Sequence, residues 1–172
     1  MQLPLMLEHY SSGFISGDAH VSLWVRPSGS RDGFNIPLNP VAINNINQTN
    51  INLSANVQGI RLSGTISFTY TGSPPVNTVY VYAQSADGQW YSGSSNIRWP
   101  SQNTAWSLLV PASASQRQIR LIVDGAYTDD SEEDYIYEHI FSRSVERNVS
   151  NQNITGISLN LGTVTKDSAG LR

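Results

Sequence analysis

The chain has 172 residues, of which 39% are hydrophobic and 13% charged, and its formal net charge is −3. The hydrophobic share is enough for a packed core, which excludes a wholly disordered chain. Lysines and arginines form no cluster, which argues against a nucleic-acid partner, because binding phosphates requires basic groups. The absence of cysteine excludes disulfides and thiolate metal sites. No apolar run approaches the roughly 20 residues of a membrane span.

The N-terminal part, residues 1–58, carries short strand signals that are separated by polar and proline-containing stretches. Its Asn-rich segment 44–56 keeps enough isoleucine, leucine and valine to form a strand pair rather than a linker. We predict strands near residues 19–25, 33–38, 41–46 and 49–57.

The rest of the chain, residues 59–172, alternates apolar and polar residues and lacks helical periodicity. Turn-forming residues separate the alternating runs: Gly72–Pro75, Asp87–Gly88, Pro111 and Asp124–Gly125. We predict strands near 60–70, 78–84, 89–95, 104–110, 117–123, 135–142 and 154–164. The fold class is therefore all-β, an antiparallel β-sandwich of the immunoglobulin-like or prealbumin-like kind.

Two N-terminal segments resemble later ones, which indicates a repeated β unit. Residues 21–25 (VSLWV) read like 119–123 (IRLIV), and 49–53 (TNINL) like 155–159 (TGISL). We predict a segment at 1–58 that matches the back half of the unit, and a complete module at 59–172. In the alternative arrangements, the front half of the first copy is lost by truncation, or residues 3–16 replace it, or one larger sandwich absorbs all the strands.

The run 62–68 (LSGTISF), the turn 72–76 (GSPPV) and the strand 79–82 (VYVY) resemble the opening of transthyretin-like, carboxypeptidase-regulatory-like sandwich domains. The later segment 105–111 (AWSLLVP) is similar to their third element. The resemblance covers about residues 60–125. It implies a non-catalytic module that recurs in secreted or cell-surface bacterial proteins, including carbohydrate-degrading ones, beside other domains of the parent chain.

Aromatic residues among neutral polar neighbours are the first candidate site, because flat rings stack on the C–H faces of sugars. If the hairpin turns at Asp87–Gly88, Tyr82 lies opposite Tyr91. We predict an exposed platform that consists of Tyr80, Tyr82, Gln89, Trp90, Tyr91 and Trp99. Under the plainer interpretation, these tyrosines only pair across strands. Trp106 is expected in the core, and Trp24 at a domain contact.

The acidic run 129–134 is the second candidate, because calcium prefers several hard oxygen ligands on a loop. Asp129, Asp130, Glu132 and Asp134 are the predicted ligands. The spacing matches no EF-hand, and the alternative is a solvated acidic loop. No cofactor is expected to be required.

Catalysis is the weakest candidate. The three histidines are scattered, and no nucleophile motif or phosphate-binding loop is present. We expect a non-enzymatic, secreted or cell-surface module that binds polysaccharide. The alternative is a structural or adhesive repeat that spaces or attaches other domains.

Overall fold

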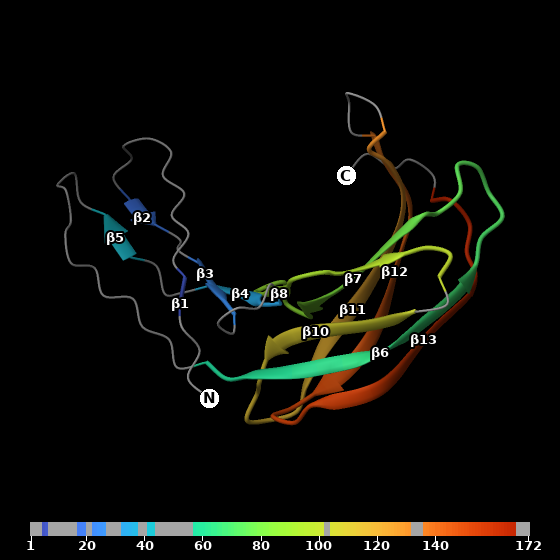
Figure 1. Ribbon diagram of the computed structural model, residues 1–172. Helices are drawn as coiled ribbons and strands as arrows, with labels where there is room; N and C mark the ends of the chain where they lie inside the picture. Colours follow the sequence, from blue (N-terminus) through green and yellow to red (C-terminus); the bar gives the residue numbers. More distant parts are fainter. Residues whose placement is uncertain are drawn as a thin grey trace.

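The computed structural model describes residues 5–6, 17–19, 22–26, 32–37, 41–43, 57–101, 104–131 and 136–167. Every secondary-structure element in these ranges is a strand, so the all-β prediction is confirmed (Figure 1). The strands are β1 (Leu5–Met6), β2 (Gly17–Ala19), β3 (Ser22–Val25), β4 (Phe34–Pro37), β5 (Val41–Ile43), β6 (Gly59–Thr69), β7 (Thr78–Ser85), β8 (Tyr91–Ser92), β9 (Ser95–Arg98), β10 (Ala105–Pro111), β11 (Arg117–Asp129), β12 (Ile136–Val149) and β13 (Ile154–Thr163).

Two sheets form the layers of a sandwich. The large sheet has the strand order β1-β3-β4-β8-β7-β11-β12, with β9 paired to β7. The small sheet has the order β10-β6-β13 and lies below it in Figure 1. All pairs in the two layers are antiparallel except β13 with β6, which is parallel. A short pair, β2 with β5, forms a separate sheet.

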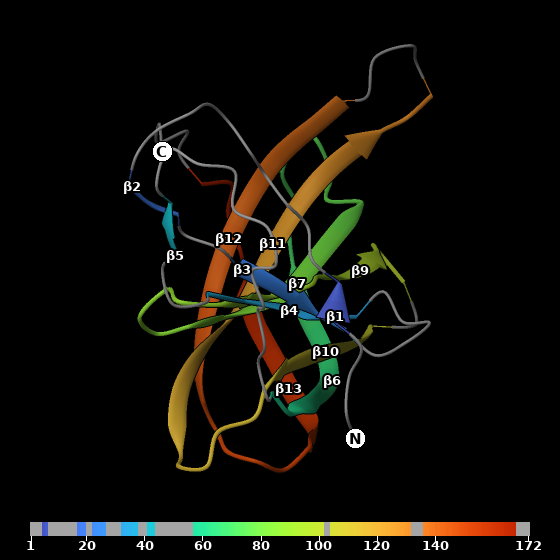
Figure 2. The same cartoon turned by 90° about the vertical axis from the view of Figure 1, so that its left-hand side faces the viewer.

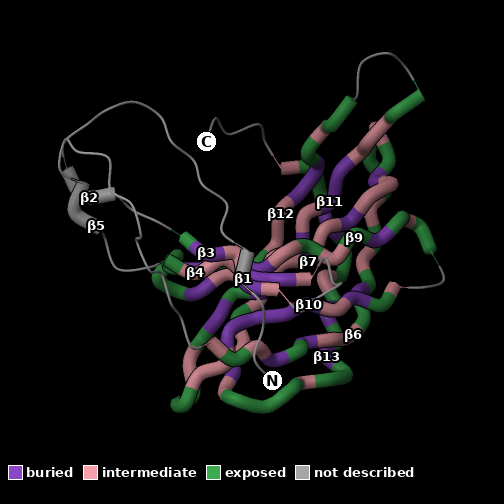
Figure 3. The backbone as a smooth tube through the Cα atoms, turned by 60° about the vertical axis from the view of Figure 1, so that its left-hand side comes forward, coloured by how far each residue is buried: buried purple, intermediate pink, exposed green. Residues whose placement is uncertain are grey.

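The core lies between the layers, and alternating side chains of strands such as β7 point into it. Val79, Val81 and Ala83 of β7 are fully buried, whereas the residues between them are not. Strand β11 contributes its own buried set in the same way, and Figure 3 shows the buried positions in purple along these strands. Trp106 of β10 is 2% exposed, so its predicted place in the core is confirmed.

Three of the described N-terminal strands, β1, β3 and β4, continue the large sheet. Strand β4 pairs with β8, and β3 and β1 extend the sheet beyond β4. Phe34 belongs to a buried cluster with Leu23, Val25 and Leu109, and Leu109 belongs to β10 of the small sheet. These contacts favour the alternative of one larger sandwich, although the boundary at residues 58–59 remains a prediction. Residues 49–53, half of the predicted repeat, lie outside the described residues.

The predicted turn at Asp124–Gly125 does not form. Strand β11 continues to Asp129 and makes a long hairpin with β12, which projects past the other strands in Figure 2. The register of this pair shifts between Gly125 and Ala126. A Cβ at Gly125 would lie 2.3 Å from a ring carbon of Phe141. Glycine is therefore required here by the close approach of a buried ring, not by a turn.

The predicted strand at 89–95 is divided in two. Strand β8 pairs with the end of β7 at Gln84, and β9 pairs with its beginning, from Val81 to Thr78. The Gly93 N–H donates to the Gly33 carbonyl between these two strands (2.7 Å). The break lets β8 also pair with β4, which brings the N-terminal strands into the sheet.

Candidate functional site

The outer face of the large sheet carries a continuous row of side chains across six neighbouring strands. The registers place each member directly opposite the next one. Strands lie about 4.8 Å apart, so the row is about 24 Å long. We call it the cross-strand row, and its members are Trp24, Asn35, Tyr91, Gln84, Arg120 and Glu146.

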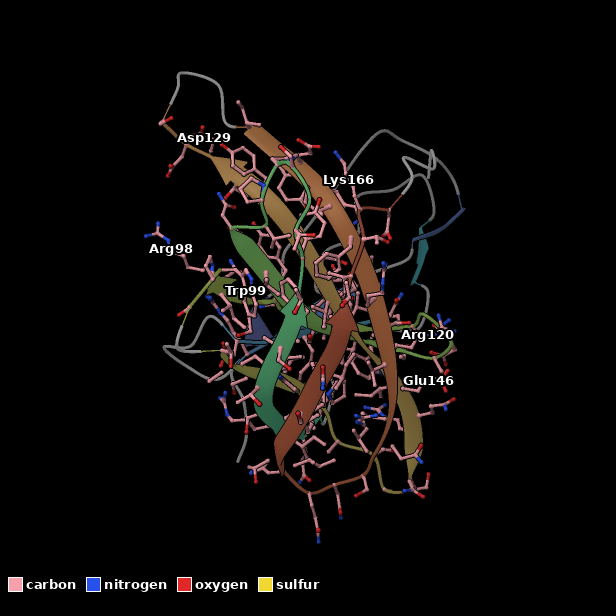
Figure 4. All side chains as sticks on the ribbon, turned by 90° about the vertical axis from the view of Figure 1, so that its right-hand side faces the viewer. Arg98, Trp99, Arg120, Asp129, Glu146 and Lys166 are labelled. Carbon is pink, nitrogen blue, oxygen red and sulfur yellow. The ribbon has the colours of Figure 1, made fainter. Side chains whose placement is uncertain are left out.

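The cross-strand row faces away from the core. Its members are exposed or half-buried, whereas Leu23, Phe34 and Ala83, which precede them in β3, β4 and β7, are buried. Because successive side chains of a strand point to opposite faces, the whole row lies on the solvent side. Figure 4 labels Arg120 and Glu146 next to each other on one side of the sandwich.

One end of the row is aromatic. The ring centroids of Trp24 and Tyr91 lie 6.3 Å apart with their planes tilted by 48°. Tyr91 is 50% exposed, among the most exposed large hydrophobic residues that the structure describes. Asn35 stands opposite both residues, and its side-chain amide donates to Ser22 Oγ (3.0 Å). Trp24, which was expected at a domain contact, therefore shares an accessible surface with Tyr91.

The other end of the row is polar and charged. The Gln118 side chain donates from Nε2 to Glu146 Oε2 (2.7 Å), which holds that carboxylate beside Arg120. Among the described residues, no ion pair engages the exposed Arg120 side chain. An amide, a guanidinium and a carboxylate therefore follow the two rings along one line.

Tyr80 and Tyr82 are half-buried and lie on this outer face, at the two alternate positions of β7 that precede Gln84. Tyr82 does not stand opposite Tyr91, as we predicted, because a hairpin that turns at Asp87–Gly88 pairs residues equally distant from the turn, and Gln84 is the partner at that distance. The hairpin closes at Ser85 and Trp90, where the Ser85 N–H donates to the Trp90 carbonyl (3.0 Å). Tyr80 packs instead near Tyr137 of β12, with ring centroids 6.4 Å apart.

Trp90 does not belong to an exposed platform. Its side chain is 5% exposed and is part of the main core cluster. The reason is alternation: Trp90 and Tyr91 are adjacent, so when Tyr91 faces solvent, Trp90 faces inward. The Trp90 backbone N–H donates to Ser85 Oγ (3.1 Å), which fixes this inward position.

Trp99 is separated from Tyr91 by most of the length of β7. It follows β9 at the Thr78 end of β7, whereas Tyr91 pairs at the Gln84 end, about 20 Å away. Its ring is half-buried and stacks on Phe68 of the small sheet, with centroids 4.1 Å apart. Trp99 therefore covers one end of the core, and it cannot join Tyr91 in a single platform.

The acidic run lies at the end of the β11–β12 hairpin. Ser131 donates to Asp129 from its hydroxyl (2.6 Å) and its N–H (3.0 Å), and these bonds lower the pKa of Asp129. Asp130 is exposed, and Glu132 and Asp134 lie outside the described residues. In the part of the chain that the structure describes, no three potential ligand side chains cluster. Calcium binding stays a prediction.

Gln89 is exposed in the β7–β8 turn, beside a cavity of about 410 Å³. The cavity lining also includes Trp90, Asp87 and Arg117. Gln89 and Trp90 are predicted site residues, whereas Arg117 is not. Asn35, Arg120 and Glu146 of the cross-strand row were not predicted either, because only the strand pairing places them beside the aromatic residues.

Comparison with known proteins does not assign the chain to a family. No protein-family model matches the chain, and no curated protein or solved structure matches it. The class is therefore the one that the fold defines, an all-β protein with antiparallel sheets in two layers. Within the described residues, no helix has the length and apolar character needed to cross a membrane.

Proposed function

We propose that the protein is a non-catalytic polysaccharide-binding module of a secreted or cell-surface bacterial protein, and that the cross-strand row is its binding surface. The observation that supports this proposal is the register that aligns the exposed ring of Tyr91 and the half-buried ring of Trp24 with an amide, a guanidinium and a carboxylate.

The chemistry of the row suits a sugar chain. Aromatic rings such as those of Trp24 and Tyr91 offer apolar faces to the C–H groups of a pyranose. Gln84 and Asn35 have both donors and acceptors, Arg120 has only donors, and Glu146 accepts, so together they match hydroxyl groups of either polarity. A length of about 24 Å accommodates several consecutive sugar units.

The test is binding to soluble and insoluble polysaccharides by affinity electrophoresis and pull-down. Tyr91→Ala should weaken binding at least tenfold, equivalent to about 1.4 kcal/mol, because it removes half of the aromatic surface. Tyr137→Ala is the matched control, since Tyr137 is equally exposed, at 49%, but lies outside the row.

Two outcomes would contradict this proposal. If Tyr91→Ala and Tyr137→Ala bind as the unmodified protein does, the cross-strand row is not the binding surface. If no polysaccharide binds, the alternative of a structural or adhesive module that attaches other domains replaces it.

A further inference from the structure

A cavity of about 410 Å³ lies next to the cross-strand row, two residues further along the strands. Three of its lining residues lie two positions from a member of the row: Pro37 from Asn35, Ala86 from Gln84, and Gln118 from Arg120. They therefore share the outer face of the sheet. The remaining lining residues come from the β7–β8 turn and the start of β11: Ser85, Asp87, Gln89, Trp90 and Arg117.

Arg117 supplies the positive charge in this cavity. Its guanidinium carbon lies 4.8 Å from the centroid of the Trp90 ring, and one of its nitrogens donates to the Pro111 carbonyl. Its Nε is buried and has no hydrogen-bond partner, and no described carboxylate lies within ion-pair distance. Burial lowers the pKa of Arg117, while the charge of Asp87 acts in the opposite direction.

A partly buried cation without a carboxylate is unfavourable by itself, and a bound anion would offset its lost hydration. Guanidinium groups hold carboxylates through charge-assisted hydrogen bonds, often two at once. The cavity volume lies within the range of small-molecule sites. An anionic group of a small ligand would therefore give Arg117 a direct ion pair, which Asp87 does not provide because it acts from beyond ion-pair distance.

Asp87 determines which kind of anion fits. The Ser85 hydroxyl and the Gln89 N–H (3.1 Å) hydrogen-bond to its carboxylate, and they lower the pKa of Asp87. Asp87 is therefore ionised at neutral pH and only accepts hydrogen bonds, as hydroxyl groups of a ligand would require. One cation and one anion in the same cavity disfavour a dianionic phosphate and favour a ligand with a single carboxylate and several hydroxyls.

We propose that this cavity binds a sugar acid, with the carboxylate on Arg117 and the hydroxyls on Asp87 and the side-chain amide of Gln89. The site consists of residues other than those of the cross-strand row. It goes beyond the proposed polysaccharide binding and does not depend on it.

The test is a titration of the full chain with galacturonic acid, followed in ¹H–¹⁵N NMR spectra at the Trp90 indole N–H and the Arg117 Nε–H. Both signals should shift with galacturonic acid and not with galactose, its neutral counterpart. Arg117→Gln should weaken binding at least tenfold. Ala86→Trp should also abolish galacturonic acid binding. Ala86 is exposed and lines the cavity, so a large side chain there occupies the space of the ligand and not that of the core.

Three results would overturn the proposal. Equal binding of galactose would remove the role of the carboxylate, and sulfate that binds as tightly as galacturonic acid would indicate a general anion site. Absence of any shift in the folded protein would show that the cavity is not a binding site. Tyr91→Ala should leave galacturonic acid binding unchanged, which separates this site from the cross-strand row.

Discussion

At the scale of single residues, Trp90 and Tyr91 show how one step along a strand separates two roles. Trp90 fills the core and supports Arg117 on the face of its ring, whereas Tyr91 is half exposed beside Trp24. Both residues are aromatic and adjacent, so their composition alone does not distinguish them. The difference comes from which of the two faces the small sheet.

Trp90→Ala should lower the free energy of unfolding by about 3–5 kcal/mol, because it removes a large buried ring. Tyr91→Ala should lower it by less than about 1 kcal/mol, since the ring is half exposed. Chemical denaturation of the two variants measures the difference. Similar losses for both would mean that the facing of this strand is wrong.

Asp167 attaches the segment that follows β13 to strand β12. Its carboxylate accepts from the Ser142 N–H (2.7 Å) and from Arg143 (2.6 Å), and its own N–H donates to the Ile140 carbonyl (2.8 Å). Burial would raise the pKa of Asp167, but the bonds from Arg143 and Ser142 and the charge of Arg143 lower it overall. The ionised form is therefore the one that stabilises the fold.

Asp167→Asn should lower the free energy of unfolding at pH 7 by about 1–2 kcal/mol, because it weakens hydrogen bonds to a charged group. A carboxyl whose folded pKa is lowered stabilises the protein above its unfolded pKa, and this contribution disappears as the pH falls. The difference from the unmodified protein should persist to about pH 4 and shrink below the usual value of 3.8. Denaturation curves at several pH values test this, and a difference that grows towards acid would contradict it.

Glu138→Gln, at a half-exposed ion pair with Lys166, is the control and should change stability little.

At the scale of elements, the small sheet depends on a close approach between β6 and β13. Gly64 stands opposite Ile157 in their parallel pairing. A Cβ at Gly64 would lie 1.8 Å from the Ile157 carbonyl oxygen, so β13 would have to move. Because backbone atoms form the obstacle, a change of side-chain rotamer cannot relieve the clash.

Gly64→Ala should therefore lower the free energy of unfolding by about 1–3 kcal/mol, which is the usual cost of inserting extra atoms into a well-packed region. Thr65→Ala, at the next and exposed position of β6, is the matched control and should cost less than about 1 kcal/mol. Thermal and chemical denaturation give both values. Equal stability of the two variants would contradict the parallel contact.

The elements also show where turn signals mislead. Asp87–Gly88 does form a turn, in which Gly88 has a positive φ of 74°. Asp124–Gly125 has the same type of sequence but continues through β11, because Gly125 makes room for the Phe141 ring. The two pairs look alike in sequence, and only the packing of β12 against β11 distinguishes them.

At the scale of the whole molecule, strands β3 and β4 and the later strands share a core. Phe34 is fully buried beside Leu109, and Ile36 packs against both buried clusters. Arg61 of β6 forms an ion pair with Asp32 (2.9 Å), which adds a further link. These contacts predict that both parts unfold together.

Phe34→Ala should lower the free energy of unfolding of the whole chain by about 3–5 kcal/mol. Calorimetry should show one transition that moves to lower temperature, because the mutated cluster includes Leu109 of the small sheet. A second transition that alone responds to the substitution would instead support an independent unit at residues 1–58.

The sequence by itself determined the all-β class, the turn at Asp87–Gly88, the inward faces of Val79, Val81 and Ala83, and the core position of Trp106. The strands and their inward faces follow from local alternation, since a strand exposes every second residue, and the turn follows from its Asp–Gly pair. The tertiary structure alone decided that Asn35 lies opposite Tyr91 and that Arg117 covers Trp90. Such contacts join distant residues through backbone hydrogen bonds and packing, which are largely independent of the local residue pattern.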